Sequence, residues 1–321
     1  MFEERIDLGP AREGVERLKS EIKKILVGQD KMVELLVAAI LANGHVLIEG
    51  FPGLAKTLTA KIVSKTISSD FKRIQFTPDM MPSDVLGTSI YNFKTSEFEY
   101  KKGPVFSNIV LIDEINRAPA KTQAALFEVM EERQITNEGI KYKMAEPFII
   151  IATQNPIDME GTYRLPEAQM DRFLFKISVD YPSLEEEIQI LNGIHDGSNT
   201  KDLSQINAVF TEEEIKQYQS KVQSIRVEEK LIRYIASLVQ QTRLYKDISI
   251  GASPRASISI LNGAKAIALI RGRDFVTPDD ILDVANPVLN HRITISPEKE
   301  MEGSSPDKII QTLINGIEIP R

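Results

Sequence analysis

Five short apolar runs alternate with amphipathic stretches between about residues 30 and 182. The runs read HVLIEG, FKRIQF, NIVLIDE, PFIIIATQNP and RFLFKISVDYP. Strands of a parallel sheet have this character, because helices cover both faces of such a sheet and leave its strands without a polar side. The alternation therefore predicts an α/β core with a parallel five-stranded sheet and helices on both faces.

Two segments interrupt this alternation. Residues 87–106 and 133–147 each contain β-prone arms around a short polar turn, KTSE in the first segment and NEG in the second. Polar turn residues between β-prone arms are typical of hairpins. We therefore expect the core to carry two hairpin inserts.

The second half of the chain has a helical pattern. Beyond Pro182, apolar residues recur three and four positions apart. Two capping boxes predict helix starts there: Ser183 with Glu186, and Thr211 with Glu214. The length of 321 residues suits two domains. We expect the α/β core over residues 1–182 and an all-α domain over residues 183–321.

The composition excludes several kinds of chemistry. The chain has no cysteine, so disulfides, thiolate metal sites and cysteine nucleophiles are ruled out. Its formal charge of -7 argues against sequence-independent nucleic-acid binding, which depends on basic side chains. The first ten residues lack the apolar core of a signal peptide, and the apolar run MVELLVAAILA is too short to span a bilayer. We therefore expect a cytoplasmic protein without a membrane span.

The stretch EGFPGLAKTLTA, residues 49–60, is close to the phosphate-binding pattern GxxxxGK[ST]. It lies between a predicted strand and a predicted helix, so backbone N–H groups and a helix dipole would face an anion there. Lys56 suits phosphate oxygens, and the hydroxyl of Thr57 suits Mg²⁺. The structural alternative is a glycine-rich turn with a surface lysine.

This loop departs from the general pattern at one position. Gly50, Lys56 and Thr57 fit, whereas Ala55 replaces the second glycine. The replacement matters if the position needs a positive φ, which costs an alanine about 1 to 2 kcal/mol. We expect strain of that size to weaken nucleotide binding without abolishing it.

Polar residues end two further apolar runs. NIVLIDEIN ends in Asp113, which suits the shell of a Mg²⁺ ion, and Glu114, which suits a base that polarises water. IIIATQNP ends in Asn155, an amide able to hold an attacking water. Because ligands of open α/β sheets bind beyond the carboxyl ends of the strands, we expect these residues to meet at one crevice. The alternatives are a solvated loop entry and a simple Asn-Pro turn.

Two arginines are further candidates. Arg172 directly precedes the last apolar run, and Arg255 lies in the first turn of a predicted helix capped by Ser253. A helix dipole disfavours a cation in that turn, which indicates that Arg255 binds an anion such as a phosphate. Surface salt bridges are the alternative for both arginines.

Taken together, these stretches closely resemble the MoxR family of AAA+ ATPases. The resemblance covers about residues 10 to 292, including VGQDKMVELLVAAILANGHVLIEGFPGLAKT, LIDEINRAPAKTQAALFEVMEERQIT, ATQNPIDMEGTYRLPEAQMDRF and GASPRA. It implies a P-loop core with hairpin inserts, an all-α lid, and ATP and Mg²⁺ as cofactors. Family members often have alanine before the phosphate-loop lysine, as at Ala55.

The resemblance also implies roles for single residues. Glu114, Asn155, Arg172 and Arg255 are implied to be catalytic, as Walker B glutamate, sensor 1, arginine finger and sensor 2 of the same subunit. Thr57 and Asp113 are implied to bind the metal. The nucleotide is implied to contact Val27, Gly28, Gln29, Gly50, Pro52, Gly53, Leu54, Ala55, Lys56, Thr57 and Leu58. Arg117 and Arg133 also lie in family-typical stretches and are alternatives to Arg172 as the finger.

We expect an ATPase that remodels a protein client in a chaperone-like way. The resemblance implies a homo-oligomer, as a hexameric ring, and a von Willebrand A domain protein as a partner. A nucleic-acid-dependent motor is the alternative, since related inserts occur in helicases, but the acidic balance disfavours it. A nucleotide-gated scaffold that seldom hydrolyses ATP is a third possibility, which the carboxylate of Glu114 disfavours.

Overall fold

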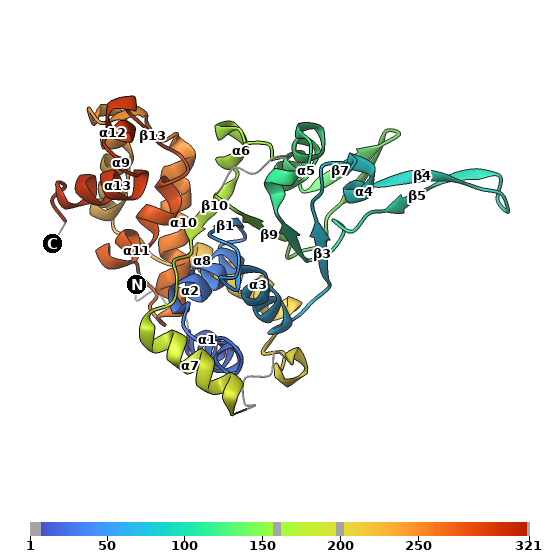
Figure 1. Ribbon diagram of the computed structural model, residues 1–321, viewed down its shortest axis with the longest axis horizontal. Coiled ribbons are helices and arrows are strands. Elements are labelled where there is room, and N and C mark those ends of the chain that lie inside the picture. The colour runs from blue at the N-terminus through green and yellow to red at the C-terminus, as the bar shows by residue number, and fades with distance from the viewer. Residues whose placement is uncertain (1–7, 157–161, 197–201, 320–321) are drawn as a thin grey trace, which may run out of the picture.

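The structure is a computed structural model that describes residues 8–156, 162–196 and 202–319, shown in Figure 1. Its core is a five-stranded parallel sheet in the order β10-β1-β9-β6-β3. The strands are β1 (His45–Glu49), β3 (Phe71–Gln75), β6 (Ile109–Asp113), β9 (Ile149–Gln154) and β10 (Phe173–Ser178). Each lies within one of the five apolar runs, so the predicted parallel sheet is confirmed.

Both faces of the sheet are buried. Along β6, Ile109 and Leu111 enter one hydrophobic cluster, while Val110 and Ile112 enter a second one on the opposite face. The first cluster includes helices α1 (Gly9–Lys23), α2 (Asp30–Leu41) and α3 (Lys56–Lys65). The second includes α4 (Pro82–Leu86) and α5 (Ala120–Glu132). Helices therefore cover both faces, as the sequence pattern predicts.

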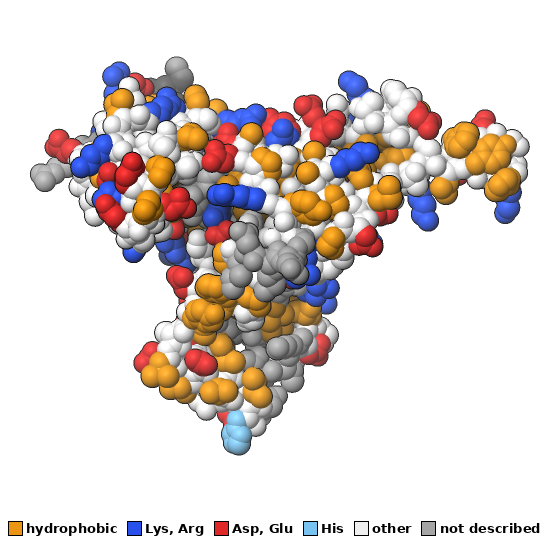
Figure 2. Space-filling view, turned by 45° about the horizontal axis from the view of Figure 1, so that its top comes forward, with side chains coloured by type: hydrophobic (Ala, Val, Ile, Leu, Met, Phe, Trp, Pro, Cys, Tyr) orange, Lys and Arg blue, Asp and Glu red, His pale blue; other side chains and the backbone are white. Residues whose placement is uncertain are grey.

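The two predicted hairpins are present. Strands β4 (Gly87–Asn92) and β5 (Glu97–Lys102) pair antiparallel, as do β7 (Gln134–Asn137) and β8 (Ile140–Lys143). The β4–β5 hairpin projects far from the core in Figure 1, and Figure 2 shows hydrophobic side chains gathered at its tip. There Tyr91 makes edge-on ring contacts with Phe93 and Phe98, which are 89% and 66% exposed.

The part beyond the sheet is mainly helical. Its helices are α7 (Leu184–His195), α8 (Glu212–Ser224), α9 (Glu229–Leu244), α10 (Pro254–Ile270), α11 (Pro278–Leu289), α12 (Pro297–Met301) and α13 (Pro306–Asn315). Both predicted capping boxes begin helices, with Ser183 capping α7 and Thr211 capping α8. A short antiparallel pair, β12 (Ile248–Ile250) with β13 (Thr294–Ile295), links the connection between α9 and α10 to the connection between α11 and α12.

Short elements connect these parts. They are β2 (Ile67–Ser68), which pairs with β11 (Phe210–Thr211), helix α6 (Glu167–Met170), and the 3-10 helices η1 (Ile115–Arg117) and η2 (Leu203–Gln205). The β2–β11 pair carries the chain back to the core after α7. The division of the chain at residue 182 stays a prediction.

The lid packs closely on the edge of the sheet. A Cβ atom at Gly263 of α10 would come within 2.9 Å of the ring of Phe175 in β10, so the helix approaches the strand at the distance that glycine allows. Within the described residues, the model contains no helix that is both long enough and apolar enough to cross a membrane.

Candidate functional site

The phosphate loop connects β1, the strand between β10 and β9, to the amino end of α3. The N–H of Gly50 donates to the carbonyl of Gln154 at 3.3 Å, which ties the loop to the end of β9. A Cβ at Gly50 would lie 2.9 Å from the carbonyl oxygen of Val179, so a side chain does not fit there. Gly50 therefore lets the loop pass between the ends of two neighbouring strands.

The other loop residues divide between surface and core. Pro52 and Gly53 are exposed, and Gly53 has a φ of +89°. Leu54 is buried, and Leu58 packs against the hydrophobic core. The exposed tip is therefore followed by two apolar residues that anchor the loop in the core.

Ala55 adopts the conformation that the missing glycine would favour. It caps α3 with φ 56° and ψ 16°, in the left-handed region. An alanine there is strained by about 1 to 2 kcal/mol. The strain is therefore a property of the folded loop, and the expected weakening of nucleotide binding remains to be measured in Ala55→Gly.

Lys56 lies across its own loop. Its ammonium group donates to the carbonyl oxygens of Gly50 and, at 3.0 Å, Phe51. Burial lowers the pKa of Lys56, and the nearby carboxylates of Glu114, Glu49 and Asp113 oppose this shift. The cation is therefore held over the loop and faces the carboxylates at the ends of the strands.

Asp113 is a buried carboxylate with three partners. Its Oδ1 accepts hydrogen bonds from the hydroxyls of Thr57 at 2.7 Å and Thr153 at 3.2 Å. Its Oδ2 accepts one from Nε of Arg73 at 2.6 Å. A hydroxyl and a carboxylate this close are oxygen donors of the type that Mg²⁺ prefers, so Thr57 and Asp113 fit this metal.

Glu114 turns away from the strand that precedes it. Its φ of 56° and ψ of 54° are left-handed, and its N–H donates to the Thr153 hydroxyl at 3.1 Å. Its carboxylate accepts from Nε of Arg117 at 2.7 Å and from the amide of Gln75 at 3.3 Å. Such strain in a non-glycine residue is typical of functional sites.

Asn155 and the VGQ segment complete the predicted set. Asn155 directly follows β9, whose last residue, Gln154, is paired with Glu49 of β1. Gly28 and Gln29 have φ values of 71° and 61°, and Gln29 caps α2. A Cβ at Gly28 would meet the carboxylate of Glu186 in α7 at 2.3 Å, so VGQ lies against the start of that helix.

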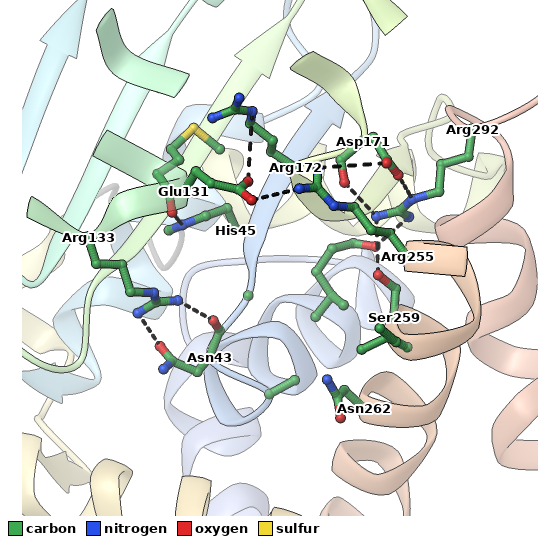
Figure 3. Close-up of a pocket in the computed structure, with 15 residues that line it drawn as sticks. Asn43, His45, Glu131, Arg133, Asp171, Arg172, Arg255, Ser259, Asn262 and Arg292 are labelled. Carbon is green, nitrogen blue, oxygen red and sulfur yellow. Dashed lines mark hydrogen bonds and ion pairs between the residues drawn. The ribbon is translucent and has the colours of Figure 1, made fainter. Parts of the chain in front are cut away.

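Arg172 and Arg255 share a different pocket, of about 250 Å³ (Figure 3). Arg255 pairs with Glu131 at 2.7 Å, and Arg172 pairs with the same carboxylate at 3.9 Å. Arg172 also donates to the carbonyl oxygen of Phe127. The two arginines, which come from the core and the lid, are therefore bridged by one glutamate at the end of α5.

This arginine pocket lies at the amino ends of the strands. Asn43, Gly44 and His45 line it, and His45 pairs in register with Phe173, the residue after Arg172. The phosphate loop leaves the other end of β1, and five strand residues at about 3.3 Å each separate the ends by roughly 16 Å. Within one subunit, Arg172 and Arg255 therefore lie at the opposite end of the strands from Lys56 and Asp113.

The alternative fingers have partners of their own. Arg133 donates to the side-chain oxygen and the backbone oxygen of Asn43, at 2.9 and 2.6 Å. Arg117 is paired with Glu114 at the carboxyl ends of the strands.

The sequence patterns did not reveal four residues that contact this machinery: Arg73, Gln75, Glu131 and Arg292. Arg292 is 2% exposed and pairs with Asp171 at 2.7 Å, which joins the lid to the residue before Arg172. Arg73, Gln75 and Arg292 lie outside the family-typical stretches, whereas Glu131 lies within one of them without a role assigned to it. The alternation of β3 offered a signal for two of the four, since it turns Arg73 and Gln75 to the same side.

A phosphate-type loop after a central strand, adjacent carboxylates at the end of a nearby strand, and a helical lid together define an AAA+ ATPase. Residues 45–175 match the model of the ATPase family associated with various cellular activities (AAA), and residues 240–313 match that of the AAA lid domain.

Similar proteins narrow this class to a family. The chain is 45% identical to the uncharacterized protein YeaC of Bacillus subtilis, covering 93% of this chain and 92% of YeaC. It is 42% identical to chaperone MoxR1 of Mycobacterium tuberculosis, covering 96% of this chain and 82% of MoxR1. A crystal structure of a protein assigned as an ATPase from Cytophaga hutchinsonii is 41% identical, with a TM-score of 0.87 and coverage of 97% and 96%. The chain belongs to the MoxR family of AAA+ ATPases.

Proposed function

We propose that this protein hydrolyses ATP at a site shared between neighbouring copies and uses the reaction to remodel a protein client. The observation that carries the proposal is the separation of the two candidate groups of residues. Lys56, Asp113 and Glu114 lie at one end of the sheet, while Arg172 and Arg255 lie at the other. A complete site then needs a second copy.

At the carboxyl ends of the strands, the chain supplies the groups that bind and activate. Lys56 neutralises phosphate oxygens, and the loop amides and the amino end of α3 orient them. Thr57 and Asp113 would hold Mg²⁺, which would supply positive charge beside the phosphates. Glu114 orients and polarises the attacking water, and Asn155 holds that water against the phosphate.

The remaining contacts position the nucleotide. They come from Val27, Gly28 and Gln29 near the base, and from Gly50, Pro52, Gly53, Leu54, Ala55 and Leu58 around the phosphates. Support comes from the tie between Gly50 and the end of β9, and from the packing of VGQ beside α7.

At the amino ends, we propose that Arg172 and Arg255 both act on the nucleotide of a neighbour. This revises the expectation that Arg255 serves its own subunit, because one carboxylate, Glu131, bridges both arginines. We propose Arg172 over Arg117 because Arg117 lies at the carboxyl ends, paired with Glu114 of its own subunit. Arg133 lines the same pocket as Arg172 and stays an alternative finger. In a head-to-tail ring each copy would present its arginines to the next copy's phosphates.

We propose a homo-oligomeric ring of six copies in the cytoplasm, with a protein client and a von Willebrand A domain partner. The relative from Mycobacterium tuberculosis is named chaperone MoxR1, which supports the chaperone-like activity. The exposed aromatic tip of the β4–β5 hairpin suits contact with apolar client segments. We do not propose the nucleic-acid motor, since the formal charge is -7.

Two single variants test the shared site. In Glu114→Gln the general base is lost, and we expect hydrolysis to fall about 10²- to 10⁴-fold. In Arg172→Ala the finger is lost, and we expect a fall of about 10³-fold or more. Mixing the two inactive variants creates interfaces with an intact base from one copy and an intact finger from the other. About a quarter of wild-type phosphate release should return in a random mixture of a closed ring.

The control for this mixture is Arg233→Ala, because Arg233 is 79% exposed on the lid and its ion pair with Glu229 lies at the surface. It should hydrolyse ATP at the wild-type rate. If the mixture of Glu114→Gln and Arg172→Ala stays inactive although both variants assemble, the site is not shared in the way we propose.

A further inference from the structure

Arg73 binds the carboxylate of Asp113, which we assign as a ligand of the metal. Its Nε lies 2.6 Å from Oδ2 of Asp113, and its terminal nitrogen Nη2 donates to the side-chain oxygen of Gln75 at 3.3 Å. The arginine side chain is 44% exposed, whereas that of Asp113 is 4% exposed. No step of the proposed mechanism uses this arginine.

The contact has a plain physical reason. A buried carboxylate that remains charged needs a cation or several hydrogen-bond donors nearby. Two hydroxyls bond to Oδ1 of Asp113, and Arg73 bonds to Oδ2. In the described part of the chain, Arg73 is thus the side chain that supplies an ion pair to this carboxylate.

We propose that Arg73 and Mg²⁺ bind Asp113 in turn, so that Arg73 must leave when a nucleotide brings the metal. This inference rests on the proposed nucleotide site. A metal held by the Thr57 hydroxyl would lie beside the same carboxylate, since Oγ1 of Thr57 and Oδ1 of Asp113 are 2.7 Å apart. Two cations there repel each other, and the divalent ion has the larger charge. Because the side chain of Arg73 is partly exposed, it can leave Asp113 and become solvated.

Gln75 reports whether Arg73 has moved. Its side-chain oxygen accepts the hydrogen bond from Arg73, and its side-chain nitrogen donates to Glu114. When Arg73 leaves, the oxygen of Gln75 loses a charged donor. The side-chain amide signal of Gln75 therefore changes if the metal displaces Arg73, and this change does not depend on hydrolysis.

The first experiment measures how strongly Mg²⁺ assists nucleotide binding. The dissociation constant of a fluorescent ADP analogue is determined with Mg²⁺ and with EDTA. The constant in EDTA divided by the constant in Mg²⁺ measures the assistance by the metal, and this ratio is compared between proteins. In Arg73→Gln the competitor is absent, and we expect the assistance by Mg²⁺ to rise about 3- to 10-fold. Arg73→Lys, which keeps a cation, should lie between the two, and it serves if Arg73→Gln does not fold.

The matched control is Lys72→Gln, which removes the same charge from the adjacent position of β3, where the side chain is also exposed. Its ratio should equal that of the wild type. If Arg73 instead positions Asp113 for the metal, the ratio in Arg73→Gln falls, and this result overturns the inference. An unchanged ratio overturns it as well.

The second experiment uses the wild-type protein. In protein labelled with [¹⁵N]glutamine, the side-chain signal of Gln75 is assigned by its loss in Gln75→Leu. We expect Mg²⁺ to shift this signal in the ADP-bound protein but not in Arg73→Gln. A signal that Mg²⁺ does not move in the wild type rejects the inference alone, whereas failure to bind ADP with Mg²⁺ rejects the proposed function and this inference with it.

Discussion

The two ends of the sheet differ in how their charges are balanced. At the carboxyl ends, Asp113 and Glu114 are paired with the arginines Arg73 and Arg117. At the amino ends the arginines are in excess, and Glu131 bridges Arg172 and Arg255.

The comparison teaches how a single copy pairs the charged residues of its candidate site. Each end neutralises its charges with a side chain from its own subunit, in contacts that are partly exposed and therefore weak. Bound Mg²⁺ would replace the arginine at Asp113 by a cation of higher charge. A neighbour's phosphates would replace Glu131 at Arg172 and Arg255 by anions of higher charge. In the proposed ring the surfaces that meet would differ, so copies would associate head to tail, and such contacts close into a ring when the rotation permits.

The largest expected effect concerns the arginine that joins the lid to the amino end. Arg292 is 2% exposed and pairs with Asp171, and it also donates to the carbonyl oxygen of Phe173 at 2.6 Å. Arg292→Leu leaves a partly buried carboxylate without its closest cation, so the free energy of unfolding should fall by about 3 to 5 kcal/mol. Urea unfolding measures this change.

The surface variant Arg233→Leu is the control, and its stability should change by less than about 0.5 kcal/mol. An equally small change in Arg292→Leu would show that the lid does not fix the amino end. The comparison between a fixed arginine pocket and a nucleotide site with replaceable partners would then fail.

Acid should act on the amino ends first. Burial, with Arg133 as the lesser cause, lowers the pKa of His45 to about 3. Burial and Arg292 also hold the pKa of His291 well below its usual value, and His291 contacts the first residue of β10. Below pH 6.5 these histidines bind protons in the unfolded chain but stay neutral in the folded protein. The free energy of unfolding therefore decreases as the pH is lowered, by up to about 1.4 kcal/mol per pH unit for each histidine.

Stability measured by urea unfolding between pH 6.5 and 4.5 checks this expectation. The slope with pH should become shallower in His45→Gln and should stay unchanged in His195→Gln, because His195 is exposed. If both variants keep the wild-type slope, protonation of His45 does not limit the stability of this end.

A smaller effect is expected when the bridge between the two arginines is removed. In Glu131→Gln, Arg172 and Arg255 lose a carboxylate that is 37% exposed, so each becomes more available to a neighbour's phosphates. We expect hydrolysis at limiting protein concentration to rise about 2- to 5-fold. Phosphate release measured over a dilution series checks this, with Glu132→Gln as the control from the next position. A fall in activity would mean that Glu131 positions the arginines.

The smallest effect is expected at the loop. Ala55→Gly relieves about 1 to 2 kcal/mol of left-handed strain but adds about 0.5 to 1 kcal/mol of backbone entropy to the unfolded chain. The folded state should gain about 0.5 to 1 kcal/mol, with little change in nucleotide affinity. Thermal unfolding and ADP titration separate the two quantities. A large gain in affinity would show that the loop changes shape on binding.

The sequence by itself determined the strands, the hairpins, the capped helices and the residues that meet at the carboxyl ends. These features follow from local patterns: an apolar run between amphipathic stretches, a polar turn between β-prone arms, and a serine or threonine three residues before a glutamate. Asp113 and Thr57 are far apart in the chain, yet parallel strands bring their ends to one edge, so their meeting was predictable.

Only the tertiary structure decided the partners of the arginines. Whether Arg255 faces its own loop or the opposite end depends on how the lid packs on β10, and no local pattern records that packing. The contact of Arg73 was equally unpredictable, because its partner Asp113 lies on a neighbouring strand whose place follows from the order of the whole sheet. Long cationic side chains reach several positions, so the final contact is selected by long-range packing and burial rather than by sequence spacing.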